Sequence, residues 1–149
     1  MIYFIADTHF GHLNIIPYCE RPFSSVDEMN NSLIRNWNGK VKDNDTVYML
    51  GDFRFSSAQK LNEICKQLNG YKILIKGNHD RNRSDISWIN GGFNEVYNPI
   101  NGMEINLSPY DKVIISHEPI ETNNILNIHG HIHNEGLKIN YPNLKQEIS

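Results

Sequence analysis

Short apolar segments that end abruptly at polar residues occupy the first half of the chain. Residues 2–6 form an unbroken apolar run of strand length, which ends at an aspartate. Two further strand-like segments, 46–50 and 71–75, run into Gly51 and Gly77. Continuous apolar runs are typical of strands that are buried on both faces. The pattern therefore predicts three core strands, each followed by a polar loop.

Two helices are predicted between these strands. Residues 25–37 carry apolar side chains at helical spacing, with Ser25 or Ser24 as the N-cap and acidic residues in the first turn. The second helix is predicted to begin after Ser57 and to end before Gly70.

The second half of the chain has a different pattern, with several short strands and little helix between them. Strands are predicted at 93–97, 103–107, 112–115 and 125–128, and the tail 137–149 can add one more. Strands alternating with helices, followed by a series of strands, indicate an α/β protein with a mixed sheet and two sheets packed face to face. We expect residues 1–149 to form a single domain, since domains cluster near ~100–150 residues.

Composition narrows the class of protein. Hydrophobic residues make up 39% and charged residues 21%, which excludes a disordered chain, a collagen-like repeat and a coiled coil. A net charge of −3 and a pI of about 6.1 give no basic field that would indicate binding to nucleic acid or to a membrane. Cys19 and Cys65 have no metal-ligand spacing, and no apolar run approaches a membrane span of ~20 residues. We therefore expect a cytoplasmic protein.

The histidines indicate where the chemistry lies. The chain has seven, and each one falls at or just after a predicted strand end: His9, His12, His79, His117, His129, His131 and His133. In open α/β sheets, ligands bind in the crevice beyond the carboxyl ends of the strands. The histidines are therefore expected to gather at one functional site.

The residues at these strand ends form a set of metal donors. Asp7 and His9 are two residues apart, as are His131 and His133, and the strand period of two places each pair on one side of a sheet. The whole set contains two carboxylates, one carboxamide and four imidazoles: Asp7, Asp52, Asn78, His9, His117, His131 and His133. This is enough for two metal ions with one bridging carboxylate, and oxygen and nitrogen donors suit Mn²⁺, iron, Ni²⁺ or Zn²⁺. Two such ions would lower the pKa of a bridging water and promote in-line displacement at phosphorus.

Five ordered motifs carry a resemblance to a known family. They are Asp7-x-His9, Gly51-Asp52, Gly77-Asn78-His79-Asp80, Ser116-His117 and Gly130-His131-x-His133. Together they resemble the motifs of the calcineurin-like metallophosphoesterases, and segment 6–23 is similar to a small bacterial and phage branch of that superfamily. The resemblance covers the chain from residue 2 to about 133. It implies a four-layer α/β/β/α sandwich of two β-sheets flanked by helices.

The resemblance also implies roles for individual residues. Seven residues would hold two divalent metal ions: Asp7, His9 and His133 the first, Asn78, His117 and His131 the second, and Asp52 both. His79 resembles the family's histidine that protonates the leaving oxygen or stabilises the transition state. Asp80 would orient the ring of His79, because a neutral imidazole needs a neighbour to fix its tautomer.

Two further residues are candidates for substrate binding, each with a plain alternative. His12 is either a substrate contact at the mouth of the site or a surface loop histidine. Arg54 follows Asp52 by two residues, and its forked donors can reach a phosphate oxygen, or it is a solvated loop arginine. Arg21 occupies a position shared with the resembling branch, without an evident purpose.

The leading hypothesis is a dinuclear metal-dependent phosphoesterase that acts through a metal-bridging hydroxide, with Mn²⁺ favoured over iron, nickel or zinc. Its substrate would be a phosphate ester of a nucleotide or a small molecule. A phosphodiester is favoured over a phosphomonoester because a small uncapped domain leaves the site open and His79 is retained. One alternative is a nuclease, since 7–11 is similar to the opening motif of DNA-repair nucleases, although the acidic pI opposes it. The other is a catalytically silent binding module, and the retained His79 opposes that. The oligomeric state stays open.

Overall fold

The computed structural model describes residues 1–55 and 57–133, and it contains two β-sheets. The first sheet has four parallel strands in the order β1-β2-β3-β4: β1 (Ile2–Ile5), β2 (Thr46–Met49), β3 (Tyr71–Ile75) and β4 (Glu95–Tyr97). In register, Phe4 pairs with Tyr48 and Tyr48 with Ile73. Because all four strands are parallel, their carboxyl ends lie along one edge of the sheet.

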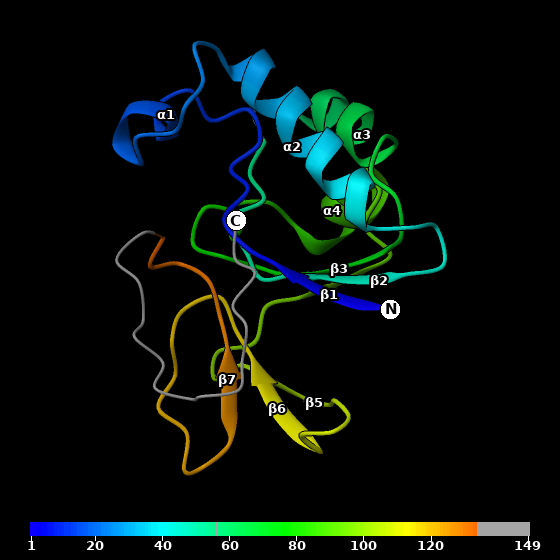
Figure 1. Cartoon of the computed structure of the whole chain (residues 1–149), viewed down its shortest axis with the longest axis vertical. Coiled ribbons are helices and arrows are strands. Elements are labelled where there is room, and N and C mark those ends of the chain that lie inside the picture. The colour runs from blue at the N-terminus through cyan, green and yellow to red at the C-terminus, as the bar shows by residue number, and fades with distance from the viewer. Residues whose placement is uncertain (56, 134–149) are drawn as a thin grey trace.

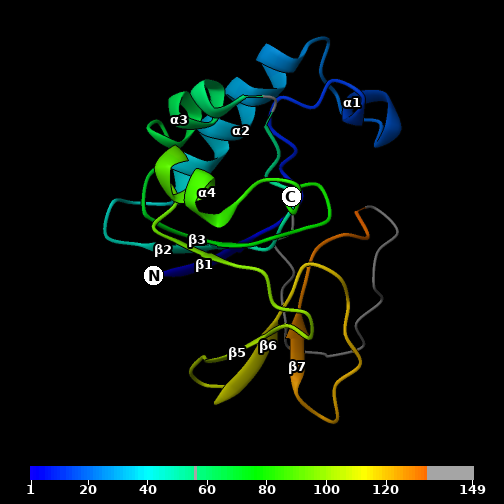
Figure 2. The same cartoon turned by 180° about the vertical axis from the view of Figure 1, so that it is seen from behind.

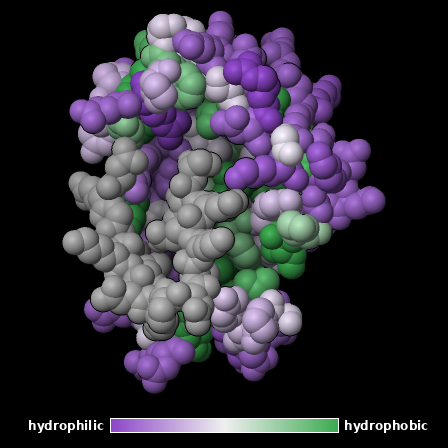
Figure 3. Space-filling model, viewed as in Figure 1, coloured by the Kyte–Doolittle hydropathy of each residue, from purple (hydrophilic) through white to green (hydrophobic). Residues whose placement is uncertain are grey.

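Three helices cover one face of this sheet, as both ribbon views show (Figure 1, Figure 2). They are α2 (Val26–Lys40), α3 (Ala58–Cys65) and α4 (Asp85–Gly91). Each begins at a serine whose hydroxyl accepts a hydrogen bond from the backbone N–H three residues later: Ser25, Ser57 and Ser84. The outer side of α2, at the upper right of Figure 3, is largely hydrophilic, as expected for a helix that buries only its inner side. The short helix α1 (Ile15–Tyr18) lies apart from the other three, near the carboxyl ends of the strands (Figure 1).

The second sheet lies against the opposite face of the first (Figure 2). Its strands are β5 (Met103–Asn106), β6 (Lys112–Ile115) and β7 (Leu126–Ile128), and it is mixed, because β5 and β6 are antiparallel whereas β6 and β7 are parallel. Buried Leu50, directly after β2, and Ile75 of β3 pack with Val113 and Ile115 of the second sheet. A second core, between the first sheet and the helices, contains Phe53 among other buried side chains. The protein is thus a mixed α/β fold with two packed sheets, as the pattern predicts.

The structure differs from the sequence-based expectation in several elements. Helices α1 and α4 were not predicted; α4 has only seven residues, and it is held by the Ser84 cap and by Trp88, which is 1% exposed. The helix after Ser57 ends at Cys65, earlier than expected. The strand expected at 93–97 begins at Glu95. The additional strand expected within 137–149 lies outside the described residues.

The expected fourth layer stays a prediction. All helices in the described ranges precede β4 in the chain, and none of them lies on the outer face of the second sheet (Figure 2). None of the helices within these ranges is long and apolar enough to span a lipid bilayer.

Candidate metal centre

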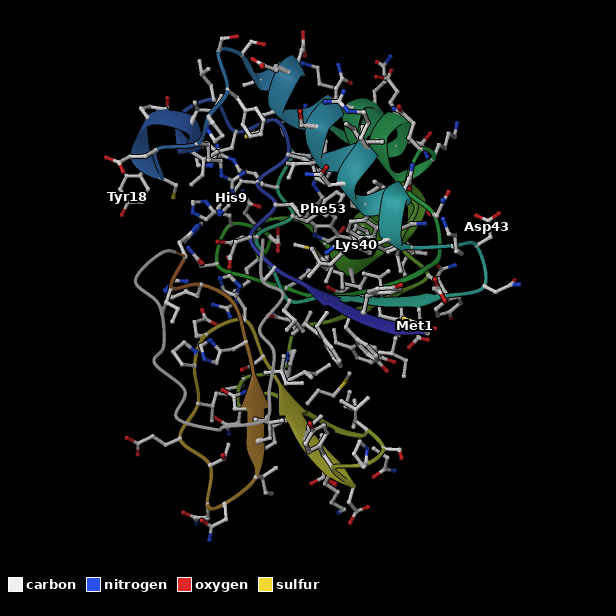
Figure 4. All side chains as sticks on the ribbon, viewed as in Figure 1. Met1, His9, Tyr18, Lys40, Asp43 and Phe53 are labelled. Carbon is white, nitrogen blue, oxygen red and sulfur yellow. The ribbon has the colours of Figure 1, made fainter. Side chains whose placement is uncertain are left out.

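Five loops meet where the carboxyl ends of the strands of both sheets come together. They follow β1, β2, β3, β6 and β7, and they carry all seven of the predicted metal donors. Figure 4 shows His9 on the segment after β1, on the side of the molecule nearest α1. The crevice expected from the positions of the histidines is therefore formed by loops of both sheets.

The backbone of these loops turns into an unusual conformation directly after the strands. Six site residues have positive φ angles: Asp7 (54°), His9 (51°), Asp52 (54°), Arg54 (53°), His131 (73°) and His133 (46°). Such left-handed residues cost of order 1–3 kcal/mol each and cluster at functional sites. The two-residue spacing does bring Asp7 and His9 together, but through left-handed turns beyond the strand and not through strand alternation.

Hydrogen bonds between the loops hold them in register. The amide of Asp7 donates to the carbonyl of Gly51 at 3.0 Å, and the amide of His9 donates to that of Asp52 at 2.9 Å. The amide of His131 donates to Asp7 Oδ2 at 2.9 Å, which links the second sheet to the first. The donors therefore sit on a framework that both sheets share.

Asp7, His9 and His133 form the first donor group, with one ligand atom from each residue within 4.8 Å of the others. Asp7 Oδ1 and His9 Nε2 are buried and have no hydrogen-bond partner among the described residues. Asp7 Oδ1 is also 4.0 Å from His133 Nε2. Buried polar atoms without a partner are costly, and a cation between them would remove that cost. The first group fits a metal ion.

Asp52, His117 and His131 form the second donor group, again with their ligand atoms within 4.8 Å of one another. In the neutral ring, His117 Nδ1 donates to the carbonyl of Leu50 at 2.8 Å, which leaves a lone pair on Nε2. That nitrogen lies 2.9 Å from Asn78 Oδ1 and 3.4 Å from Asp52 Oδ2. Since all three atoms are then electron-pair donors, a cation is the natural partner at their centre. The second group fits a metal ion as well.

The carboxylate of Asp52 lies between the two groups. Its Oδ2 atom is 3.5 Å from His9 Nε2 and 3.4 Å from His117 Nε2. Asp52 also forms a further cluster with His9 and His79. The structure thus brings all seven predicted donors together, and one carboxylate oxygen is close to both groups.

Burial and neighbouring charges shift the pKa values of the donor residues in opposite directions. Burial lowers the pKa of His9 to about 3, so its ring is neutral at ordinary pH. Burial alone would raise the pKa of Asp52, but hydrogen bonding to and the charge of His117 bring it down to about 2. Burial acts to lower the pKa of His117, but Asp52 outweighs it and the pKa is raised.

The contacts of Asp80 differ from the expectation. Its carboxylate is fully buried and accepts hydrogen bonds from the backbone N–H groups of Asp52 (2.7 Å), Gly77 (2.9 Å) and Arg54 (3.1 Å). No hydrogen bond joins it to the ring of His79 in the described part of the chain. The ring of His79 instead lies edge-on to that of His9, with the ring centres 5.3 Å apart. Asp80 therefore holds the loop of Asp52, and its expected role of orienting His79 stays a prediction.

His12 and Arg54 both lie beside the donor groups. His12 Nδ1 is 3.2 Å from His9 Nδ1, and its ring centre is 5.6 Å from that of His79. Burial lowers the pKa of His12 to about 4, and the nearby charge of Arg54 acts in the same direction. His12 is thus placed beside the donor groups, the backbone of Arg54 is held by Asp80 in the loop of Asp52, and substrate binding by the two residues stays a prediction.

Sequence reasoning gave no role to two residues that contact this site. Cys19 Sγ lies 3.5 Å from His133 Nδ1, and the guanidinium of Arg21 donates to the backbone of Asp7. The signal available in the sequence was the likeness of segment 6–23 to one branch of the family. It could not indicate which atoms these side chains touch.

Comparisons with known proteins show which family the chain is similar to. The family model for the calcineurin-like phosphoesterases matches residues 1–147. The uncharacterized protein MJ1445 of Methanocaldococcus jannaschii is 56% identical over 82 residues, which are 54% of this chain and 47% of that protein. A crystal structure of the protein of unknown function AQ665 from Aquifex aeolicus is similar with a TM-score of 0.62 and 34% identity, over 80% of this chain and 61% of that one. The chain thus spans about half of the first relative and less than two thirds of the second. Its match along almost its whole length shows that the chain belongs to the calcineurin-like phosphoesterase family.

Proposed function

We propose that this chain is a dinuclear metal-dependent phosphoesterase that hydrolyses a phosphodiester, with phosphomonoesters as the second substrate class. The observation that carries the proposal is the position of Asp52 Oδ2, 3.5 Å from His9 Nε2 and 3.4 Å from His117 Nε2. A carboxylate oxygen between imidazoles from two sheets is the arrangement that a bridging ligand needs.

The seven donors have the chemistry of a site for two divalent cations. Asp7, His9 and His133 would hold one cation, and Asn78, His117 and His131 the other, with Asp52 shared. When bound, such a pair supplies an activated water and positive charge for the phosphate oxygens. Oxygen and nitrogen donors suit Mn²⁺, which we propose as the metal, and also iron, Ni²⁺ and Zn²⁺.

His79 is the proposed general acid. Its side chain is exposed at the site while its ring adjoins that of His9, so it can reach a substrate bound at the donor groups. The backbone N–H of His79 donates to Asp52 Oδ1 at 3.0 Å, which keeps the residue beside the proposed bridging carboxylate. A proton delivered from its ring to the leaving oxygen would contribute about 10²–10⁴-fold to the rate.

Arg54 and His12 are the proposed substrate contacts. The forked donors of Arg54 match the oxygens of a phosphate. His12 directs Nδ1 toward His9, so Nε2 is the atom that would meet the substrate. A diester is favoured because the site opens on exposed residues, His79 and Asn78 among them.

The test compares two substrates in one metal buffer. The protein is stripped of metal, Mn²⁺ is restored, and hydrolysis of bis-p-nitrophenyl phosphate and p-nitrophenyl phosphate is measured. We expect turnover of the diester, loss of about 10²–10⁴-fold in His79→Ala, and loss of activity in Asp52→Asn. Asp43→Asn, a change of the same chemistry in an exposed turn, should behave as the wild type.

Each other result has a definite meaning. Turnover of the monoester alone would reject the diester preference. Mn²⁺ binding without turnover of either substrate would reject the enzyme and favour a binding module on the same fold. Cleavage of single-stranded DNA or RNA in the same buffer would favour a nuclease.

A further inference from the structure

The guanidinium of Arg21 contacts the backbone of the loop that carries the first donor group. Its Nη2 donates to the carbonyl of Asp7 at 2.7 Å, and its Nη1 donates to the carbonyl of Thr8 at 2.8 Å. Nη1 also lies 3.4 Å from the sulfur of Met29, a fully buried residue of α2. One planar side chain thus binds two successive carbonyls and rests against the core.

These two hydrogen bonds add to the backbone hydrogen bonds that hold the loop in place. The amides of Asp7, His9 and Phe10 donate to the parallel segment 51–53, at 2.9 to 3.0 Å. Those bonds fix the N–H side of the loop only. The carbonyl of His9 accepts from the amide of His12, whereas those of Asp7 and Thr8 accept from Arg21. Without the guanidinium, two carbonyls beside a left-handed residue would lose their charged donor.

The segment that carries Arg21 also reaches the third member of the first donor group. Cys19, two residues earlier, places its sulfur 3.5 Å from His133 Nδ1, on the ring nitrogen opposite the one that faces Asp7. The second donor group has different supports, such as the carbonyl of Leu50 on His117. Support from residues 19–21 is therefore directed at one of the two groups.

We propose that Arg21 is a positioning residue that sets the geometry of the first donor group by holding the backbone of Asp7 and Thr8. The inference rests on the proposed dinuclear site and adds a selective role to it. Arg21 does not touch the ligand atoms, so its effect passes through the loop. Substitution of a residue that orients metal ligands in this way typically weakens metal binding by about 10–100-fold.

The experiment measures metal binding by calorimetric titration of metal-free protein with Mn²⁺. For the wild type we expect two equivalents, and for Arg21→Ala we expect one of them to weaken by about 10–100-fold while the other is unchanged. Arg21→Lys, which offers one ammonium for two carbonyls, should weaken the same equivalent by less. Arg35→Ala is the matched control, since it removes an exposed guanidinium whose hydrogen bond goes to Ser32 on the same helix.

Two ligand variants identify the affected equivalent. In a His131→Ala background, which lacks a ligand of the second group, adding Arg21→Ala should weaken the remaining equivalent by the same factor. In a His133→Ala background, which lacks a ligand of the first group, the added change should have no further effect, since the two residues act on one site. A merely structural arginine would instead weaken the remaining equivalent in both backgrounds.

The outcomes separate this inference from the proposed function. Equal weakening of both equivalents, or two unchanged equivalents in Arg21→Ala, overturns the positioning role and leaves the dinuclear site intact. A wild type that binds no Mn²⁺ overturns both. Circular dichroism of the metal-free variants checks their folding, and Arg21→Lys provides the test if Arg21→Ala does not fold.

Discussion

A fully buried carboxylate needs hydrogen-bond donors, and Asp80 receives them from the backbone of two loops. Its two oxygens accept the N–H groups of Asp52, Gly77 and Arg54, so the residue joins the loop after β3 to the loop after β2. His79, its neighbour in the chain, faces the donor groups instead. Adjacent residues of one motif therefore have separate tasks, one in the framework and one in the proposed chemistry.

Two substitutions should separate these tasks. We expect Asp80→Asn to lower the free energy of unfolding by about 1–3 kcal/mol, because an amide group cannot accept all the bonds of a carboxylate. We expect His79→Asn to change it by less than about 0.5 kcal/mol, since its side chain is exposed, and to lower turnover instead. Urea denaturation of the metal-free proteins and the diester assay measure the two effects. An Asp80→Asn protein of unchanged stability and reduced turnover would restore the role of orienting His79.

The lowered pKa of His9 predicts a pH-dependent stability. The pKa of His9 is about 3 in the folded protein and ~6.5 in the unfolded chain. Between these two pH values, His9 is therefore protonated in the unfolded state and neutral in the folded state. The pH-dependent part of the cost of burying His9 is therefore absent well above pH ~6.5, and it grows by up to about 1.4 kcal/mol per pH unit as the pH falls toward 3.

The difference in unfolding free energy between the wild type and His9→Gln isolates this effect from the opposing one at His117. Measured by urea denaturation with a chelator present, it should shift in favour of the variant between pH 7 and pH 4. A difference that stays constant over this range would contradict the burial of a neutral His9.

At the scale of an element, the loop after β3 packs against its neighbours too closely for any side chain at Gly77. A β-carbon at Gly77 would overlap the carboxylate of Asp52, and it would lie 2.9 Å from the ring of His117. The glycine therefore allows the loops after β2, β3 and β6 to approach one another at the donor groups.

Gly77→Ala should lower the unfolding free energy by about 1–3 kcal/mol, because it overpacks a site that cannot expand. It should also weaken Mn²⁺ binding, because Asp52 must move. Gly39→Ala is the matched control: it lies in α2 with nothing within 4 Å of an added β-carbon, and it should stabilise the protein by about 0.5–1 kcal/mol. Thermal denaturation and calorimetry measure both. If Gly77→Ala and Gly39→Ala changed the unfolding free energy and the Mn²⁺ affinity equally, the loops would not be tightly packed.

At the scale of the whole molecule, the donor groups join two sheets. The first sheet supplies Asp7, His9, Asp52 and Asn78 from its loops, and the second supplies His117, His131 and His133. The two sets of donors already contact each other, because the amide of His131 donates a hydrogen bond to the carboxylate of Asp7. Bound cations would therefore stabilise the packing of one sheet on the other.

Metal addition should accordingly stabilise the protein. Mn²⁺ at about 100 times its Kd should raise the unfolding free energy by about 2.7 kcal/mol per site, and a chelator should reverse the gain. The gain should be smaller in His131→Ala and unchanged in Asp43→Asn, which lies outside both donor groups. Differential scanning calorimetry with and without Mn²⁺ tests this, and an unchanged Tm at saturating Mn²⁺ would count against metal binding by the folded state.

Local features of the chain were enough to predict the strands, two of the helices and the residues that the structure brings together at the strand ends. Apolar runs, serine caps and residue types at strand ends act over a few positions, so they can be read without tertiary contacts. The strand 71–75 and the N-caps Ser25 and Ser57 were predicted for this reason. Helix α4 was not predicted, because it is short and depends on the burial of Trp88 by distant residues.

The sequence by itself determined that oxygen and nitrogen donors stand at the ends of core strands, because hydrophobic periodicity and residue chemistry are local properties. Only the tertiary structure decided what each atom faces. It directed Asp80 to backbone amides rather than to His79, and it brought Arg21 onto the carbonyls of Asp7 and Thr8. The contacts of Arg21 with these carbonyls and of Asp80 with the amide of Asp52 join residues that lie 13 to 28 positions apart. Such contacts depend on how the loops converge when the sheets pack, and no local pattern encodes that convergence.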